Sequence, residues 1–164
     1  EIPAGPPADP ARDSEAVQRL MAGQGAKAIC GGTTAQMAAR VLKRPLRVAW
    51  QPLVAGHGPG LKLPPVGLLE GVDLVTEGIL TLSSAVDRLR SATSVHDLPP
   101  DQDAATRLAR LLLDADQLHF IVGDAINPQQ LADVVRGVPM RQLYLEELVH
   151  RLRECGKGVT VEHL

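Results

Sequence analysis

The chain has 164 residues and a formal net charge of −2, with 17 basic and 19 acidic side chains. This length is typical of one domain, and the 45% of hydrophobic residues can form a packed core, which excludes a wholly disordered chain. The near-neutral charge provides no global positive field for nucleic acid or an anionic membrane, and Trp50, Phe120 and Tyr144 are too few and scattered to form a base-stacking surface.

Apolar runs of strand length alternate with amphipathic runs of helical spacing along the chain. The predicted strands are a stub at residues 1–4 and residues 26–30, 46–50, 72–76, 118–122 and 159–162. The predicted helices are residues 10–22, 34–43, 79–91, 101–114 and 140–155, with a flexible Gly/Pro loop at 51–65 and a loop at 123–139 that includes one helical turn near 131–135. This alternation favours an α/β fold: a single three-layer Rossmann-like domain with a mainly parallel sheet.

Four of the predicted strands end in turns that contain glycine. The turns begin at Gly5, Gly31, Thr76 and Gly123. If the sheet is parallel, all four lie along one edge, and ligands bind at that edge in open α/β sheets.

The turn Gly31-Gly32-Thr33-Thr34 is the strongest single candidate for a ligand site. Glycine lets a ligand approach the backbone, and the unpaired N–H groups at a helix N-terminus favour an anion. The turn matches neither the Walker A loop nor the GxGxxG fingerprint. The alternative is a purely structural role, in which Thr33 caps the following helix.

Further candidates follow the other strands. Glu77 has two interpretations, contact with a cation or ribose hydroxyl, and a favourable charge in the first turn of a helix. Asp124 and Asn127 suit either ligand contact or turn formation, and Arg141 opens a helix that faces the same loop. The full set of predicted ligand-binding residues is Gly31, Gly32, Thr33, Thr34, Glu77, Gly78, Gly123, Asp124, Asn127 and Arg141.

The cysteines and histidines give no clear catalytic or metal centre. Cys30 and Cys155 do not form a disulfide framework, and no histidine has metal-ligand spacing with a cysteine or another histidine. Cys30 stands at a strand end before a helix, which suits either a nucleophile or a small core residue. No apolar run of 18 residues is present, so we expect a cytoplasmic chain without a membrane span. Because the chain opens with Glu1, we also expect a piece of a longer protein.

Three segments of the chain resemble the region downstream of the catalytic domain in bacterial serine/threonine phosphatases of the stage II sporulation protein E type. They are residues 29–35 (ICGGTTA), residues 69–82 (LEGVDLVTEGILTL) and residues 120–123 (FIVG) with Ile126-Asn127. The resemblance extends over nearly the whole chain, and the VDLVTEGILTL run is its most specific element. The chain departs from the family's pattern at Asp124, where a Thr is expected, and at Gln142, where a second Arg is usual.

The resemblance implies a phosphatase parent whose catalytic domain holds a pair of divalent metals through Asp-Gly motifs. This chain contains no Asp-Gly dipeptide, so it lacks those metal-dependent catalytic motifs. We therefore expect an accessory domain that senses a small anionic ligand or contacts the upstream catalytic domain or a second copy of itself. Two alternatives stay open: a small phosphoester hydrolase or transferase acting at the strand-end edge, and a structural dimerisation module.

Overall fold

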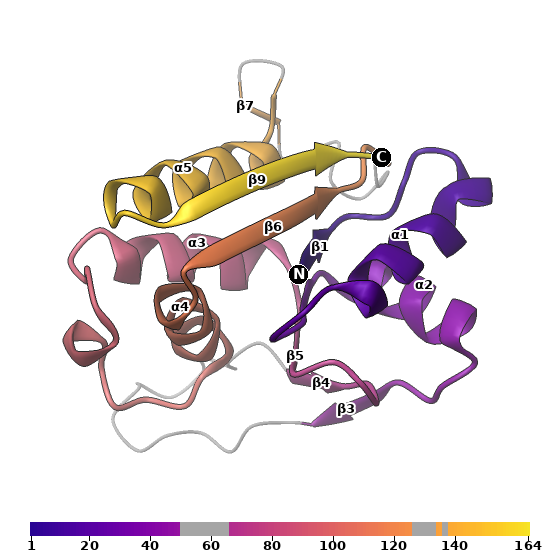
Figure 1. Ribbon diagram of the computed structural model, residues 1–164, viewed down its shortest axis with the longest axis horizontal. Helices are drawn as coiled ribbons and strands as arrows, with labels where there is room; N and C mark the ends of the chain where they lie inside the picture. Colours follow the sequence, from indigo (N-terminus) through magenta and orange to yellow (C-terminus); the bar gives the residue numbers. More distant parts are fainter. Residues whose placement is uncertain (50–65, 126–133, 136–137) are drawn as a thin grey trace.

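A central sheet organises the molecule (Figure 1). The computed structural model describes residues 1–49, 66–125, 134–135 and 138–164. Within them, seven strands lie in the order β3-β4-β5-β2-β1-β6-β9. Their bounds are β1 Ile2–Ala4, β2 Ala28–Cys30, β3 Arg47–Ala49, β4 Val66–Leu68, β5 Leu74–Thr76, β6 Gln117–Val122 and β9 Gly158–His163. A separate hairpin joins β7 (Val134–Val135) to β8 (Val138–Pro139).

Helices cover both faces of the sheet and bury two apolar cores. The helices are α1 Asp13–Ala22, α2 Gly32–Leu42, α3 Ile79–Leu89, α4 Ala104–Asp114 and α5 Met140–Glu154, with 3-10 turns at Pro10–Arg12 and Val95–Asp97. On one face α1 and α2 pack against alternate strand residues such as Ile29 and Ile121. On the other face α3, α4 and α5 pack against the intervening ones, among them Phe120. This confirms the predicted α/β fold with three layers and a mainly parallel sheet.

The parallel part of the sheet is its centre, and the antiparallel part is one side. Strands β5, β2, β1, β6 and β9 are parallel to their neighbours, whereas β4 is antiparallel to both β3 and β5. The sequence failed to predict β4, because a three-residue strand with a central Gly67 carries almost no periodicity. Consequently β3, predicted in a simple parallel unit with β2, lies instead at the edge of the sheet beside β4.

Several boundaries also differ from the sequence prediction. Helix α2 begins at Gly32 rather than near residue 34, and α4 begins at Ala104, with Asp103 as its N-cap. Residues 134–135, predicted within a helical turn, form β7 of the hairpin. Asp9 caps the 3-10 turn that leads into α1, because its carboxylate accepts the Ala11 N–H.

No helix among the described residues has both the length and the apolar character that crossing a bilayer requires. The predicted flexible loop at 51–65 and the candidate residue Asn127 lie outside the described residues.

Candidate functional site

The four glycine-containing turns meet in one row at the carboxyl edge of the sheet. The last residues of β6, β1, β2 and β5 are in register across the sheet: Ala4 pairs with both Val122 and Cys30, and Cys30 pairs with Thr76. The residue that follows each of these strands therefore lies at the same edge of the sheet. The predicted convergence of these turns is confirmed, and it places the described candidate residues in neighbouring loops.

The turns after β2 and β5 are tied together through the backbone. The Gly31 N–H donates to the Thr76 carbonyl at 3.1 Å, and the Gly32 N–H donates to the Glu77 carbonyl at 2.7 Å. A Cβ on Gly78 would lie 3.4 Å from the Gly31 Cα. The Gly31 and Gly32 amides are thus already bonded within the protein. The first amide at the N-terminus of α2 that could bind an anion is therefore that of Thr33.

The two threonines at the start of α2 have different roles. Thr34 is buried, and its Oγ1 accepts the Gly5 N–H at 3.0 Å, which ties the turn after β1 to α2. Thr33 is exposed, and the helix is capped at Gly31 without a side-chain hydrogen bond. The interpretation of Thr33 as the N-cap is therefore wrong. Its hydroxyl and its N–H form no hydrogen bond within the described residues, so they are free to meet a ligand.

Glu77 closes the N-terminus of α3. Burial raises the pKa of its carboxyl group, and hydrogen bonds from the Leu80 and Thr81 amides act in the opposite direction. Glu77 stands before the Gly78 N-cap, so its predicted position in the first turn of the helix is wrong. Its carboxylate nevertheless accepts amides of that turn, where the helix dipole favours a negative charge. The other carboxylate oxygen, Oε2, is buried without a partner among the described residues, as is the Thr81 hydroxyl oxygen.

The turn after β6 packs directly on the turn after β1. A Cβ on Gly123 would lie 2.0 Å from the Pro6 carbonyl oxygen, so only glycine fits there. The Ala125 N–H donates to the same carbonyl at 3.1 Å. Asp124 is exposed, and its carboxylate lies 3.2 Å from Nδ1 of His163 at the end of β9. Pro6 and His163 were absent from the predicted site, and their place in it depends on strand order.

Arg141, in the first turn of α5, points into this junction. Its Nη2 donates to the Gly123 carbonyl at 2.9 Å. A Cβ on Gly5 would lie 2.2 Å from Nη1, so the guanidinium occupies the space that a side chain would need. Arg141 thus belongs to the same edge as the α2 turn, as the sequence predicts.

Cys30 is not equipped to be a nucleophile. It is buried in the core at the end of β2, and burial raises the pKa of its thiol to about 12, although a hydrogen bond with Thr76 acts in the opposite direction. The thiol is therefore protonated at neutral pH, and the thiolate is the reactive form. Among the described residues, no group of three or more His, Cys, Asp and Glu side chains is placed to hold a metal ion.

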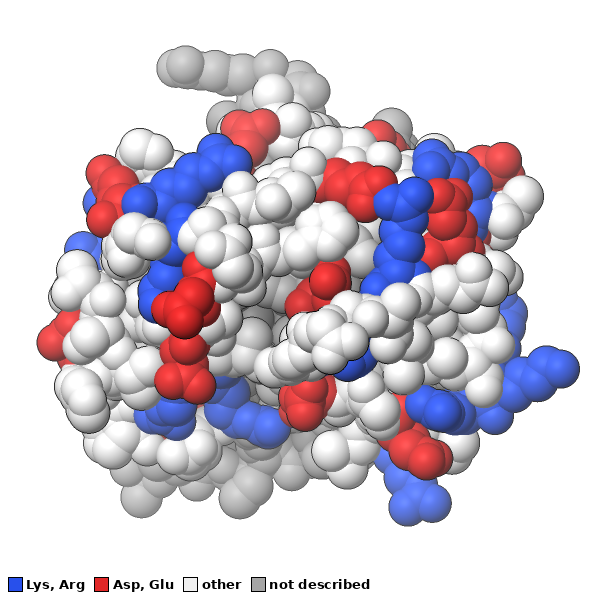
Figure 2. Space-filling model, viewed as in Figure 1, with Lys and Arg blue, Asp and Glu red and all other residues white. Residues whose placement is uncertain are grey.

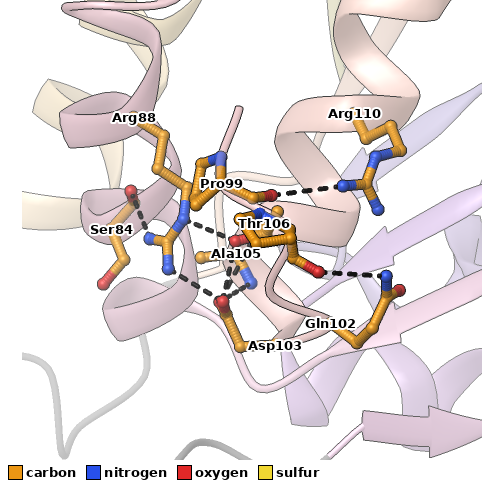
Figure 3. A network of polar contacts seen from close by, with 9 residues as sticks. Ser84, Arg88, Pro99, Gln102, Asp103, Ala105, Thr106 and Arg110 are labelled. Carbon is orange, nitrogen blue, oxygen red and sulfur yellow. Dashed lines mark hydrogen bonds and ion pairs between the residues drawn. The ribbon is translucent and has the colours of Figure 1, made fainter. Parts of the chain in front are cut away.

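A further polar network lies away from this edge. Arg88 of α3 donates to Asp103, to Thr106 and to the Ser84 carbonyl, at 2.9, 2.7 and 3.0 Å (Figure 3). Asp103 in turn accepts the Ala105 and Thr106 amides at the start of α4. The network joins α3 to α4, because Arg88 of one helix binds the Asp103 carboxylate that caps the other.

The surface charge follows no single sign. On the face shown in Figure 2, acidic and basic side chains are interspersed over the described residues. Ion pairs among the described residues include Arg90 with Glu147 and Arg19 with Glu15.

Comparison with known proteins gives no relative to name: no family model, no curated protein and no solved structure matches the chain.

Proposed function

We propose that the chain is an accessory domain that binds a small anionic ligand at the carboxyl edge of its sheet. The observation that carries the proposal is the in-register row of strand ends β6-β1-β2-β5. In open α/β sheets ligands bind outside the carboxyl ends of the strands. The exposed first turn of α2 and the Arg141 guanidinium both favour a negatively charged group there.

The same proposal includes the parent protein. The resemblance of residues 69–82 and 29–35 to the downstream region of bacterial sporulation-type serine/threonine phosphatases supports an origin in such a protein. Its catalytic domain would be the direct partner, and the site of action would be the cytoplasm. A second copy of the chain is another candidate partner. The hydrolase alternative has less support, because the protonated Cys30 thiol provides no nucleophile.

A thermal-shift experiment tests ligand binding. Wild-type protein is heated with a panel of nucleotides, phosphorylated metabolites and small carboxylates. A ligand at 100 times its Kd stabilises the folded state by about 2.7 kcal/mol, which corresponds to a rise in Tm of about 5–10 °C for a domain of this size.

Two matched variants locate the site. Thr33→Asp adds a negative charge beside the proposed ligand, yet it suits the first turn of α2 and should preserve or raise the Tm. Ser14→Asp makes the same change at the second residue of α1, which is also exposed. We expect Thr33→Asp to lose the ligand-induced shift and Ser14→Asp to keep it. The proposal fails if no compound shifts the wild type, or if Thr33→Asp responds as the wild type does.

The full open reading frame tests the proposed parent. An upstream segment with Asp-Gly metal-binding motifs is expected, and an upstream segment of another enzyme class contradicts a phosphatase origin.

A further inference from the structure

Arg141 occupies a position that electrostatics disfavours. It is the second residue of α5, and a cation in the first turn of a helix opposes the helix dipole. Burial lowers the pKa of its guanidinium, while the charge of Asp124 acts in the opposite direction. An arginine nevertheless stays protonated in proteins, so a positive charge is held here at a cost in desolvation.

That charge has no direct counter-ion within the described residues. Arg141 forms one hydrogen bond there, to the uncharged Gly123 carbonyl, and no ion pair. The nearby Asp124 carboxylate is paired instead with His163. Arg88, the other inward-facing arginine, shows the contrast, because it contacts the Asp103 carboxylate, a hydroxyl and a carbonyl at once (Figure 3). Within the part of the chain that the structure describes, Arg141 thus keeps donors available that a structural arginine would use.

The backbones of Gly5 and Gly123 hold the Arg141 guanidinium in place. Its Nη1 and Cζ lie 2.2 and 2.7 Å from the position of a Cβ on Gly5, so it rests directly on that backbone. On the same residue, the Gly5 N–H reaches Thr34 Oγ1 in the first turn of α2. Gly5 is therefore the shared neighbour of Arg141 and of the exposed end of α2. An anion placed above Gly5 would meet the Arg141 guanidinium beside the first turn of α2.

We propose that Arg141 binds the anionic group of the ligand, a carboxylate or a phosphate, above Gly5 between the ends of β1 and β6. This inference rests on the proposed ligand-binding function and specifies which residue recognises the charge. A guanidinium presents five donors in a planar fork that matches two oxygens of such a group. Lysine carries the same charge but lacks the fork, so the assignment predicts a requirement for arginine and not merely for a cation.

NMR of the wild-type protein tests the contact without any substitution. The Nε–Hε signal of Arg141, assigned by comparison with the Arg141→Lys spectrum, is followed during titration with sodium phosphate and, separately, sodium acetate. Sodium chloride at matched ionic strength is the reference. We expect a saturable shift with phosphate, with acetate or with both. Phosphate alone identifies a phosphorylated ligand, and acetate alone identifies a carboxylic acid. A response that does not exceed the chloride reference overturns the assignment.

Arginine variants then separate this inference from the proposed function. With the compound that gives the largest thermal shift, we expect Arg141→Lys to bind at least about tenfold more weakly. Arg153→Lys is the matched control, because Arg153 lies on the same helix, is exposed and, among the described residues, donates only to the Val159 carbonyl. If Arg141→Lys keeps full affinity while Thr33→Asp loses it, the ligand site stands and the role of Arg141 is wrong. If no compound binds the wild type, the proposed function itself fails.

Discussion

Gly5 is held at the carboxyl edge by both its backbone conformation and its packing. Its φ is +95°, a left-handed conformation that side chains rarely adopt, and its open face is filled by Arg141. The backbone carbonyl of Gly123 lies 2.7 Å from the position of its missing Cβ. Because the second neighbour is backbone, it cannot rotate away as a flexible side chain would.

Gly5→Ala should therefore destabilise the fold in two ways. Backbone strain at positive φ costs about 1–2 kcal/mol, and forcing a methyl group into filled space adds about 1–3 kcal/mol. Gly25→Ala is the control, since Gly25 has a φ of +76° but nothing within 4 Å of its Cβ position. Urea unfolding should show a larger loss of stability for Gly5→Ala, and equal losses would contradict the packing described for this edge.

The start of α2 shows why the roles of single residues could not be predicted from the sequence. The sequence predicts either ligand contact or helix capping for Thr33-Thr34, and the assignment of Thr33 as the cap is wrong. Helix α2 begins two residues earlier than expected, which turns Thr34 inward toward Gly5 and leaves Thr33 exposed. A shift of one residue rotates a side chain by about 100° around a helix, and sequence rarely fixes a helix start that closely.

Secondary-structure elements were predicted well where their periodicity was long. Helices α3, α4 and α5 and strand β6 were expected within a few residues of their observed bounds, because repeated leucines mark one helical face and LHFIV marks a buried strand. Three of the described strands escaped prediction. Strand β4 has a central Gly67 that interrupts its apolar pattern, and β7 and β8 have two residues each, too few for any period to be visible.

The polar contact between α3 and α4 is made through the Asp103 carboxylate. Desolvation by burial is the largest influence on Asp103 and would raise its pKa, but bonds from Thr106 and Ala105 and the charge of Arg88 together outweigh it, so the pKa is lowered below its ordinary value of 3.8. A lowered pKa in the folded state means that the carboxylate stabilises the fold above pH 3.8. That contribution is lost as the pH falls through the folded-state pKa.

Asp103→Asn should cost about 1.5–3 kcal/mol at pH 7, the range for hydrogen bonds to a charged group. The difference from wild type should shrink as the pH falls below about 3.8, because the wild-type carboxyl then loses its charge as well. Urea unfolding over a pH series measures it. Asp101→Asn is the control, since Asp101 lies outside the Arg88 network. A loss for Asp103→Asn that stays constant down to pH 2.5 would contradict the role given to its charge.

At the scale of the whole molecule, the parallel strands convert sequence-distant turns into one surface. The class of fold and the convergence of the four turns could be predicted, because strand–helix alternation favours a parallel sheet. The strand order could not, because it depends on pairing between strands that are far apart in the chain, such as Ile2 with Phe120. The contacts of His163 and Pro6 with the β6 turn follow from that order and were missed for the same reason.

Backbone amide mapping tests the central claim most directly. A ¹⁵N HSQC titration is run to saturation with the compound of the panel that gives the largest thermal shift, or with sodium phosphate if no compound gives a larger thermal shift than phosphate does. The account predicts the largest changes at the carboxyl edge, in the turns at residues 5–6, 31–34, 77–79 and 123–124 and at Arg141. Changes centred on the opposite edge of the sheet or on the α3–α4 contact, or no saturable change at all, would contradict it.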